Sequence, residues 1–178
     1  KNKRPAGAPP PPPRGVPSPP GLSAPPPPRG ERAPPPYRRN CSLAMIDIDW
    51  FKHYNDCHGH LRGDEVLREA AAVFRGCIRT SDIAARYGGE EFVVIMPETT
   101  RELALLAGEK LRRAVEEHPF PLRETQPGGA LTISIGIATF PDDAEEGREL
   151  VEAADRALYR AKEGGRNRVV AAVADGAD

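Results

Sequence analysis

The sequence predicts an α/β domain over residues 41–174, in which helices flank a mixed central sheet. Three observations support this fold class. The chain has 178 residues, 39% of them hydrophobic, which is enough to bury a core without disulfides or a structural metal. From Asn40 onward, short apolar runs alternate with segments of helical periodicity. Two of those runs flank a Gly-Gly pair, which is a hairpin signal. The pattern leaves open whether the domain has two layers or three.

The first half of the domain is expected to contain three strands and one helix. Residues 42–48 are a compact apolar run with the length of a buried strand. Residues 63–77 have a helical face, because their apolar side chains recur at steps of three and four. Residues 83–86 and 92–96 are the two strands of the hairpin. The stretch between the first strand and the helix is expected to be a loop, with Trp50 and Phe51 packed beneath it.

The second half is expected to alternate helix and strand. Residues 101–117 have helical periodicity. Residues 131–140 alternate large aliphatic with small side chains, as a central strand does. Residues 148–162 are again helical, and residues 167–173 form a last short strand. Strands separated by helices, together with the hairpin, predict a mixed sheet.

Residues 1–40 differ in composition from the rest of the chain. They hold 16 of the 21 prolines and carry a charge of +7, so that residues 41–178 carry −8. Proline lacks the N–H that helices and sheets need, so we expect a disordered Pro/Arg-rich segment without a core. A linker is the favoured interpretation, and a ligand for proline-binding modules is the alternative. Residues 175–178 are expected to be a short tail.

Cysteine usage, hydropathy and charge limit the environment and the partners. The cysteines Cys41, Cys57 and Cys77 cannot all pair within one chain, and their spacing suits a reducing cytosol. No apolar run approaches the ~20 residues of a membrane span. A net charge of −1 argues against a basic nucleic-acid binder. We expect a cytoplasmic domain without a nucleic-acid partner. The start at Lys1 suggests a fragment of a longer protein, whose full length is free to be membrane-tethered.

Acidic residues gather at the ends of predicted strands. Asp47 and Asp49 share one face where the first strand ends, either as ligand or metal groups or as a solvated strand end. Glu90 and Glu91 directly follow the Gly-Gly pair, and adjacent like charges are unfavourable unless a cation neutralises them. If the first strand lies beside the hairpin, Asp47 and Glu90 converge. Such oxygen-only ligation suits Mg²⁺ or Mn²⁺.

Basic and histidine residues give weaker signals. Lys162 and Arg166 bracket two glycines at a helix end, where they either cap the helix or bind a polyphosphate. His53, His58 and His60 lie in the expected loop and form a zinc signal that no further ligand completes.

Several blocks in fixed order resemble the GGDEF diguanylate cyclase domain. They are MIDIDWFK (45–52), ND (55–56), GHLRGD (59–64), RYGGEEF (86–92), TISIG (132–136), ADRALYRAK (154–162) and GRN (165–167). A lone GGEEF would be weak, whereas the whole set is specific. The resemblance implies a palm-like fold shared with adenylyl cyclases and polymerases. It also implies condensation of two GTP into cyclic di-GMP with release of two pyrophosphates. Because one domain holds one GTP, it further implies a homodimer.

The resemblance assigns roles to individual residues by position. The implied metal ligands for Mg²⁺ or Mn²⁺ are Asp47, the Ile48 carbonyl and Glu90. The implied substrate residues are Asn55 and Asp64 for the guanine edge, Lys52, Lys162 and Arg166 for phosphates, and His60, Gly88 and Gly89. Glu90 or Glu91 is implied to help deprotonate the 3′-hydroxyl, and sequence does not separate a base role from a metal role.

An Arg-x-x-Asp motif precedes the hairpin. Arg79 and Asp82 match the inhibitory product site of the family, and the alternative is an ordinary helix end followed by a turn. A second arginine often assists in the family. Lys110 occupies that position here and lacks the planar fork of arginine, so we expect product inhibition to be weaker than is usual.

The resemblance fails before the first strand. The family usually has a helical segment, D-x-L-T-x-L-x-N-R-R, which covers one side of the sheet and borders the nucleotide pocket. Residues 1–40 stand in its place without matching it, and its loss would expose apolar surface. One hypothesis is that residues 1–40 are coding DNA read out of frame. We also expect an upstream sensor or receiver domain outside this chain. The alternative function is an impaired module that binds GTP or cyclic di-GMP as a receptor.

Overall fold

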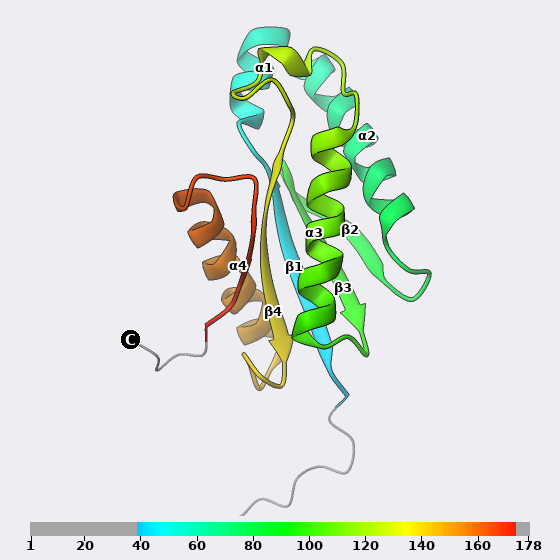
Figure 1. The fold of residues 1–178 in the computed structure, drawn as a ribbon, viewed down its shortest axis with the longest axis vertical. Helices are drawn as coiled ribbons and strands as arrows, with labels where there is room; N and C mark the ends of the chain where they lie inside the picture. The colour runs from blue at the N-terminus through cyan, green and yellow to red at the C-terminus, as the bar shows by residue number, and fades with distance from the viewer. Residues whose placement is uncertain (1–38, 174–178) are drawn as a thin grey trace, which may run out of the picture. The chain divides into compact units, whose positions relative to one another are not determined.

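The central strand of the sheet is β1 (Cys41–Ile48), in a computed structural model that describes residues 39–173. Figure 1 shows the elements around it. In chain order they are α1 (Phe51–His58), α2 (His60–Cys77), β2 (Ile83–Gly88), β3 (Glu91–Pro97), α3 (Arg101–Glu117), a 3₁₀ turn (Arg123–Thr125), β4 (Ile133–Phe140), α4 (Gly147–Glu163) and β5 (Val169–Ala171). The expectations for residues 1–38 and 174–178, including the Pro/Arg-rich segment and the tail, lie outside the described residues.

The sheet is mixed, as the sequence predicts. Its strand order is β2-β3-β1-β4-β5. β1 runs antiparallel to both neighbours, which sets Asp47 opposite Glu91 on β3 and Ile48 opposite Ile133 on β4. β5 pairs in parallel with β4. The register therefore brings the acidic end of β1 beside the start of β3.

Helices cover both faces of the sheet, so the domain has three layers. α2 and α3 lie on one face and α4 lies on the other (Figure 1). Alternate residues of β1 point to opposite faces: Ile46 joins the core under α2 and α3, whereas Met45 joins the core under α4. Both side chains are at most 2% exposed. Burial of this apolar surface is the main favourable term holding the layers together.

α4 approaches β4 more closely than a side chain would permit. A Cβ on Gly136 would lie 2.1 Å from the Ala154 carbonyl oxygen and 2.2 Å from the Leu158 nitrogen. Both are backbone atoms, so they cannot rotate away. Gly136 therefore allows α4, whose last turn carries Lys162, to pack directly against β4.

The first correction to the sequence analysis is helix α1. The expected loop is helical from Phe51 to His58 and ends at Gly59, whose φ of 83° breaks the helix before α2. The helix escapes periodicity analysis because it buries only Phe51 and Tyr54. Trp50 is also corrected: its backbone is left-handed and its side chain is 45% exposed rather than packed beneath a loop.

Strand β2 is the exposed edge of the sheet. All six of its residues are exposed, including Ile83 and Tyr87 at 57% and 61%. On the neighbouring strand, side chains alternate between buried and half-buried. In the part of the chain that the structure describes, helix α4 packs over β1 and β4, which leaves apolar side chains of the hairpin partly open to solvent.

Candidate active site

The Gly-Gly-Glu-Glu turn lies against the end of β1. Gly89 has a φ of 48°, which a glycine adopts without strain. The backbone N–H of Ile48 donates to the Glu90 carbonyl at 3.3 Å. Arg86 braces the turn, since its Nε donates to the Gly89 carbonyl at 2.8 Å. The hairpin and β1 therefore converge as expected, and a Cβ at Gly88 or Gly89 would meet nothing within 4 Å.

Asp47 is the most perturbed acid at this junction. Its side chain is 9% exposed, and Lys162 Nζ lies 2.7 Å from its Oδ2. Burial raises the pKa of Asp47 to about 6, against the opposing effect of the Lys162 ammonium, while Glu90 and Asp49 add to the rise. A further cation beside this buried carboxylate would stabilise its charged form. Lys162 lies in the last turn of α4, so one residue both ends the helix and pairs with the β1 acid.

The donor atoms at this junction fit a hard divalent cation. Asp47 and Glu90 offer carboxylate oxygens, and no sulfur or imidazole is among the predicted ligands, as Mg²⁺ or Mn²⁺ requires. Among residues 39–173 no group of three His, Cys, Asp or Glu side chains is close enough to form a metal centre alone. An ion here needs additional oxygens, from the backbone or from a bound phosphate.

A pocket of about 450 Å³ opens beside the turn. It joins six of the predicted site residues: Lys52, Asn55, His60, Asp64, Gly89 and Glu90. Four further lining residues were not predicted as site residues: Phe51, Asp56, Leu67 and Arg86. Their positions depend on helix α1 and on the pairing of β2, which sequence patterns did not fully resolve. Asp47, Lys162, Arg166, Gly88 and Glu91 do not line this pocket.

Asn55 carries an orphaned acceptor within this pocket. Its Oδ1 is buried and has no hydrogen-bond partner. Such an atom is costly to bury unless a ligand or water satisfies it. Gly63 makes the room, because a Cβ there would lie 1.9 Å from that oxygen. Gly63, in the GHLRGD block, therefore needs to lack a side chain so that the Asn55 amide can lie in the wall of the pocket.

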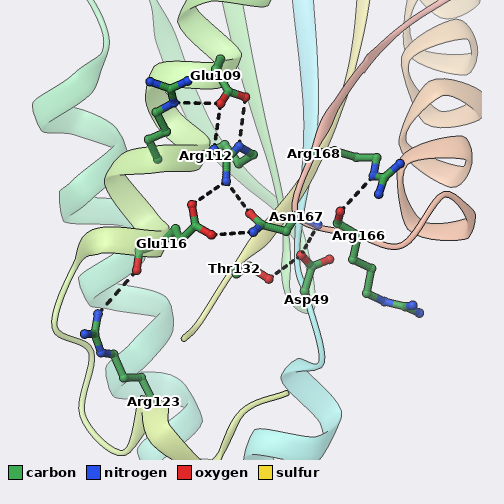
Figure 2. Close-up of polar contacts among 10 residues, drawn as sticks. Asp49, Glu109, Arg112, Glu116, Arg123, Thr132, Arg166, Asn167 and Arg168 are labelled. Atoms are coloured by element: carbon green, nitrogen blue, oxygen red, sulfur yellow. Dashed lines mark hydrogen bonds and ion pairs between the residues drawn. The ribbon is translucent and has the colours of Figure 1, made fainter. Parts of the chain in front are cut away.

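The loop after α4 holds Arg166 against Trp50. The Arg166 guanidinium carbon lies 4.1 Å from the centre of the Trp50 ring, a cation–π arrangement. Asp49, which precedes Trp50, is not a solvated strand end. It is 1% exposed and accepts hydrogen bonds from Thr132 Oγ1 and from the backbone N–H of Asn167, at 2.7 and 3.0 Å (Figure 2). It anchors the loop instead of facing Asp47's site.

The two histidines of α1 share Thr125 as a hydrogen-bond partner. His53 and His58 both hydrogen-bond Thr125, through its carbonyl and its hydroxyl at 3.2 and 2.8 Å. They tie α1 to the 3₁₀ turn, whereas His60 lines the pocket. Within the described part of the chain, His60 does not join His53 and His58 in a group of three ligands.

The Arg-x-x-Asp motif forms a tight exposed turn between α2 and β2. The Arg79 N–H donates to Asp82 Oδ2 at 2.9 Å, and the Asp82 N–H donates to the Arg79 carbonyl at 3.0 Å. Lys110 on α3 reaches the same region, because its Nζ donates to the Cys77 carbonyl at 2.8 Å. The motif and the Lys110 ammonium thus both lie around the end of α2.

Comparison with known proteins identifies the domain. Residues 31–168 match the family model described as "Diguanylate cyclase, GGDEF domain". The chain belongs to the GGDEF family. Diguanylate cyclase A of Treponema denticola is 44% identical over 132 residues, which are 74% of this chain and 35% of that protein. The response regulator PleD of Caulobacter vibrioides is 44% identical over 129 residues, 72% of this chain and 28% of that protein.

Solved GGDEF structures share the fold. The GGDEF domain of DgcB from Caulobacter crescentus, crystallised with c-di-GMP, has a TM-score of 0.66 and 40% identity, covering 74% of this chain and 77% of that one. The active GGEEF domain of a diguanylate cyclase from Vibrio cholerae has a TM-score of 0.70 and 34% identity, covering 76% and 85%. The predicted palm-like α/β fold of the GGDEF family is therefore confirmed.

The chain spans only about a third of the length of the curated relatives it matches. GGDEF relatives thus carry further sequence beyond the part shared with this chain. Within residues 39–173, none of the helices has the length and apolarity that crossing a bilayer requires.

Proposed function

We propose that the chain is the catalytic domain of a diguanylate cyclase, with domain boundaries at about residues 41 and 174. The reaction joins two GTP into cyclic di-GMP and releases two pyrophosphates. The observation that carries the proposal is one pocket that holds Asn55 and Asp64 together with Glu90 of the acidic turn. Groups suited to a guanine thus share a cavity with a group suited to the reacting phosphate.

Guanine selection follows from the polar groups of the pocket. The Asp64 carboxylate accepts from the ring N–H and the amino group of guanine, an arrangement that adenine does not offer. The Asn55 amide lines the same pocket and offers a second polar group for the guanine. A site built to hydrogen-bond a substrate N–H strongly rejects an analogue that lacks it, because the buried groups are then left unpaired.

The phosphate side of the site is acidic and basic at once. Asp47, Glu90 and the Ile48 carbonyl would hold Mg²⁺ or Mn²⁺, which supplies neutralisation of the phosphate charge. Lys52 lines the pocket and Lys162 pairs with Asp47 at the end of β1, so both are suited to the triphosphate, as is Arg166. Glu90 or Glu91 accepts the proton of the attacking 3′-hydroxyl. His60 and Gly89 line the space that the nucleotide would occupy, and Gly88 leaves room beside it because it has no side chain.

Cyclisation requires two copies of the domain. A cavity of about 450 Å³ suits one nucleotide, whereas the product contains two guanosines. We propose that a homodimer brings two loaded pockets face to face, so that each 3′-hydroxyl attacks the α-phosphate held by the other copy. Formation of this dimer is the natural point of control for an upstream sensor or receiver domain.

Product inhibition is proposed at Arg79 and Asp82. Arg79 is exposed and Asp82 is half-buried on a hydrogen-bonded turn, where they would meet the phosphates and guanine of cyclic di-GMP. Lys110 adds a point charge nearby instead of a bidentate fork, which makes the inhibition weaker.

The test is incubation of the purified chain with GTP and Mg²⁺, followed by chromatography for cyclic di-GMP. Glu90→Gln is expected to abolish product, because it removes a charged ligand of the acidic junction without changing its size. Glu152→Gln is the matched control, since Glu152 is 52% exposed and pairs with Arg148 on the outer side of α4. Product that persists in Glu90→Gln would refute the assigned role of the turn.

The second candidate is a receptor that binds nucleotide without turnover. The exposed apolar side chains of Ile83 and Tyr87 on β2 favour this function. They show that the sheet is incompletely covered at the strand that leads into the acidic turn, which would impair catalysis there. A folded protein that binds GTP or cyclic di-GMP but yields no product in the same assay would establish this function in place of the cyclase.

A further inference from the structure

Arg112 of α3 lies at the centre of a half-buried polar cluster. Its side chain is 12% exposed. Its Nη1 donates both to Glu116 Oε2 and to Asn167 Oδ1, each at 2.7 Å, while Nε and Nη2 donate to the two oxygens of Glu109 at 2.9 and 2.8 Å. Asn167 Nδ2 in turn donates to Glu116 Oε1 at 2.7 Å, which closes a ring of three residues (Figure 2).

The cluster holds in place a loop whose backbone conformation is unfavourable on its own. Arg166 and Asn167 have φ values of 64° and 46°, so two successive non-glycine residues are left-handed. Each such residue costs on the order of 1–2 kcal/mol, and the conformation persists only when its surroundings fix it. The fixing contacts are the side-chain amide of Asn167, held by Arg112 and Glu116, and its backbone N–H, held by Asp49 at 3.0 Å.

The same loop sets the position of the Arg166 side chain against Trp50. Because Arg166 directly precedes Asn167, the clamp on Asn167 sets the direction in which Arg166 leaves the backbone. Its guanidinium lies over Trp50, 4.1 Å from the ring centre and just beyond the acidic end of β1. Arg168 reinforces the turn, since its Nε donates to the Arg166 carbonyl at 3.0 Å.

We propose that Arg112 is a positioning residue for GTP binding: through Asn167 it holds Arg166 where the triphosphate is met. The inference rests on the proposed function, because it takes Arg166 as a phosphate-binding residue. Arg112 itself lies on α3 and touches no lining residue of the nucleotide pocket in the contacts described above. It acts on nucleotide only through the loop.

A purely structural role for Arg112 makes a different prediction. In that case, loss of the cluster lowers the free energy of unfolding and leaves the Arg166–Trp50 contact and the triphosphate affinity of the folded protein unchanged. Trp50 is the single tryptophan of the chain, so its emission reports the contact directly. The signal needs neither nucleotide nor activity.

The test uses two perturbing variants, a control and a double variant. Arg112→Lys keeps the charge but cannot reach all of its partners at once. Asn167→Gly removes the clamped amide while glycine tolerates the left-handed backbone. Arg113→Lys is the control, because Arg113 is 65% exposed and pairs with Glu109 without contacting Asn167 in the described part of the chain. For each folded variant, the thermal midpoint, Trp50 emission and affinity for a non-hydrolysable GTP analogue are measured, with and without Arg166→Ala.

Arg112→Lys and Asn167→Gly are both expected to shift Trp50 emission toward that of Arg166→Ala. Each is expected to lower the affinity for the GTP analogue about tenfold, which is the effect of losing one charge-assisted hydrogen bond. In the Arg166→Ala background neither should weaken it further, because the residue through which they act is gone. Arg113→Lys should change neither quantity.

Two results would overturn the inference. One is unchanged Trp50 emission and analogue affinity in folded Asn167→Gly, even if Arg112→Lys unfolds. The other is a full tenfold loss in the Arg166→Ala background, which would show that Arg112 acts independently of Arg166. Failure of the proposed function is distinguishable, since the chain would then form no cyclic di-GMP while the emission shift still appears.

Discussion

Replacement of Gly63 by alanine is expected to weaken GTP binding without loss of stability. The new Cβ would lie 1.9 Å from Asn55 Oδ1 and 2.9 Å from its Cγ. Ordinary contact between such atoms needs about 3.5 Å. The Asn55 amide must therefore swing away by roughly 1.5 Å. It is free to do so because it is the end of a side chain and makes no hydrogen bond through Oδ1.

The expected magnitudes differ for stability and for binding. Alanine in place of glycine within a helix gains up to about 1 kcal/mol, which offsets the displacement of the Asn55 amide and a small shift of the Phe51 ring, whose Cζ would lie 3.1 Å from the new Cβ. Loss of a buried hydrogen bond to guanine costs about 1–3 kcal/mol, which is about 5-fold to 150-fold in affinity. The two effects act on different quantities and are measured separately.

The assay pairs thermal unfolding with equilibrium titration of a non-hydrolysable GTP analogue. Gly76→Ala is the matched control on the same helix, since a Cβ there would meet nothing within 4 Å. It should match or exceed the wild type in thermal midpoint and bind the analogue equally. Wild-type affinity in folded Gly63→Ala would refute the assignment of Asn55 to the guanine.

Three further predictions test the fold, the charge cluster and the inhibitory turn. Gly136→Ala should cost at least about 1–3 kcal/mol in chemical denaturation, because its Cβ would press on the backbone of α4; Gly147→Ala, where space is open, should cost far less, and equal effects would contradict the close approach. The Arg112 guanidinium lowers the pKa of Glu109 from 4.5 to about 2. The ionised Glu109 therefore adds its full contribution to the free energy of unfolding above pH 4.5 and loses it as the pH falls toward 2. Because the Glu109 side chain is 38% exposed, we expect about 1 kcal/mol over this range, absent in Glu109→Gln when urea unfolding is followed against pH; parallel profiles for the two proteins would be the contrary result. Arg79→Ala should raise the cyclic di-GMP concentration for half-inhibition at least about tenfold and Lys110→Arg should lower it, as initial rates with added product would show; an unchanged value in both would remove the inhibitory role from this turn.

Elements with a strong periodic pattern were predicted well. The predicted helix at 101–117 has the bounds of α3, and the hairpin strands and the central strands lie where the apolar runs predicted. The last strand is shorter than predicted, Val169–Ala171 within 167–173, because Asn167 is bound to Arg112 and Glu116 in a left-handed turn instead of a strand. Helix α1 was missed because its burial rests on two residues.

The site residues were predicted from their family positions, but their partners were not. The resemblance assigned Lys162 to phosphates, whereas the structure pairs it with Asp47, which no local pattern indicated. Asp49 was grouped with Asp47 by strand alternation, yet it turns into the core to bind Thr132, Ser134 and Asn167. These contacts join residues more than 80 positions apart, beyond the reach of periodicity.

The sequence by itself determined the α/β class, the mixed sheet and the residues of the acidic turn, because periodicity and turn chemistry are local properties of the chain. Tertiary structure alone decided the three layers, the orphaned Asn55 oxygen in the wall of the pocket and the clamp of Arg112 on the Arg166 loop. Each of these depends on which distant atoms come within a few ångströms of one another. That is settled only when the cores on the two faces of the sheet pack together.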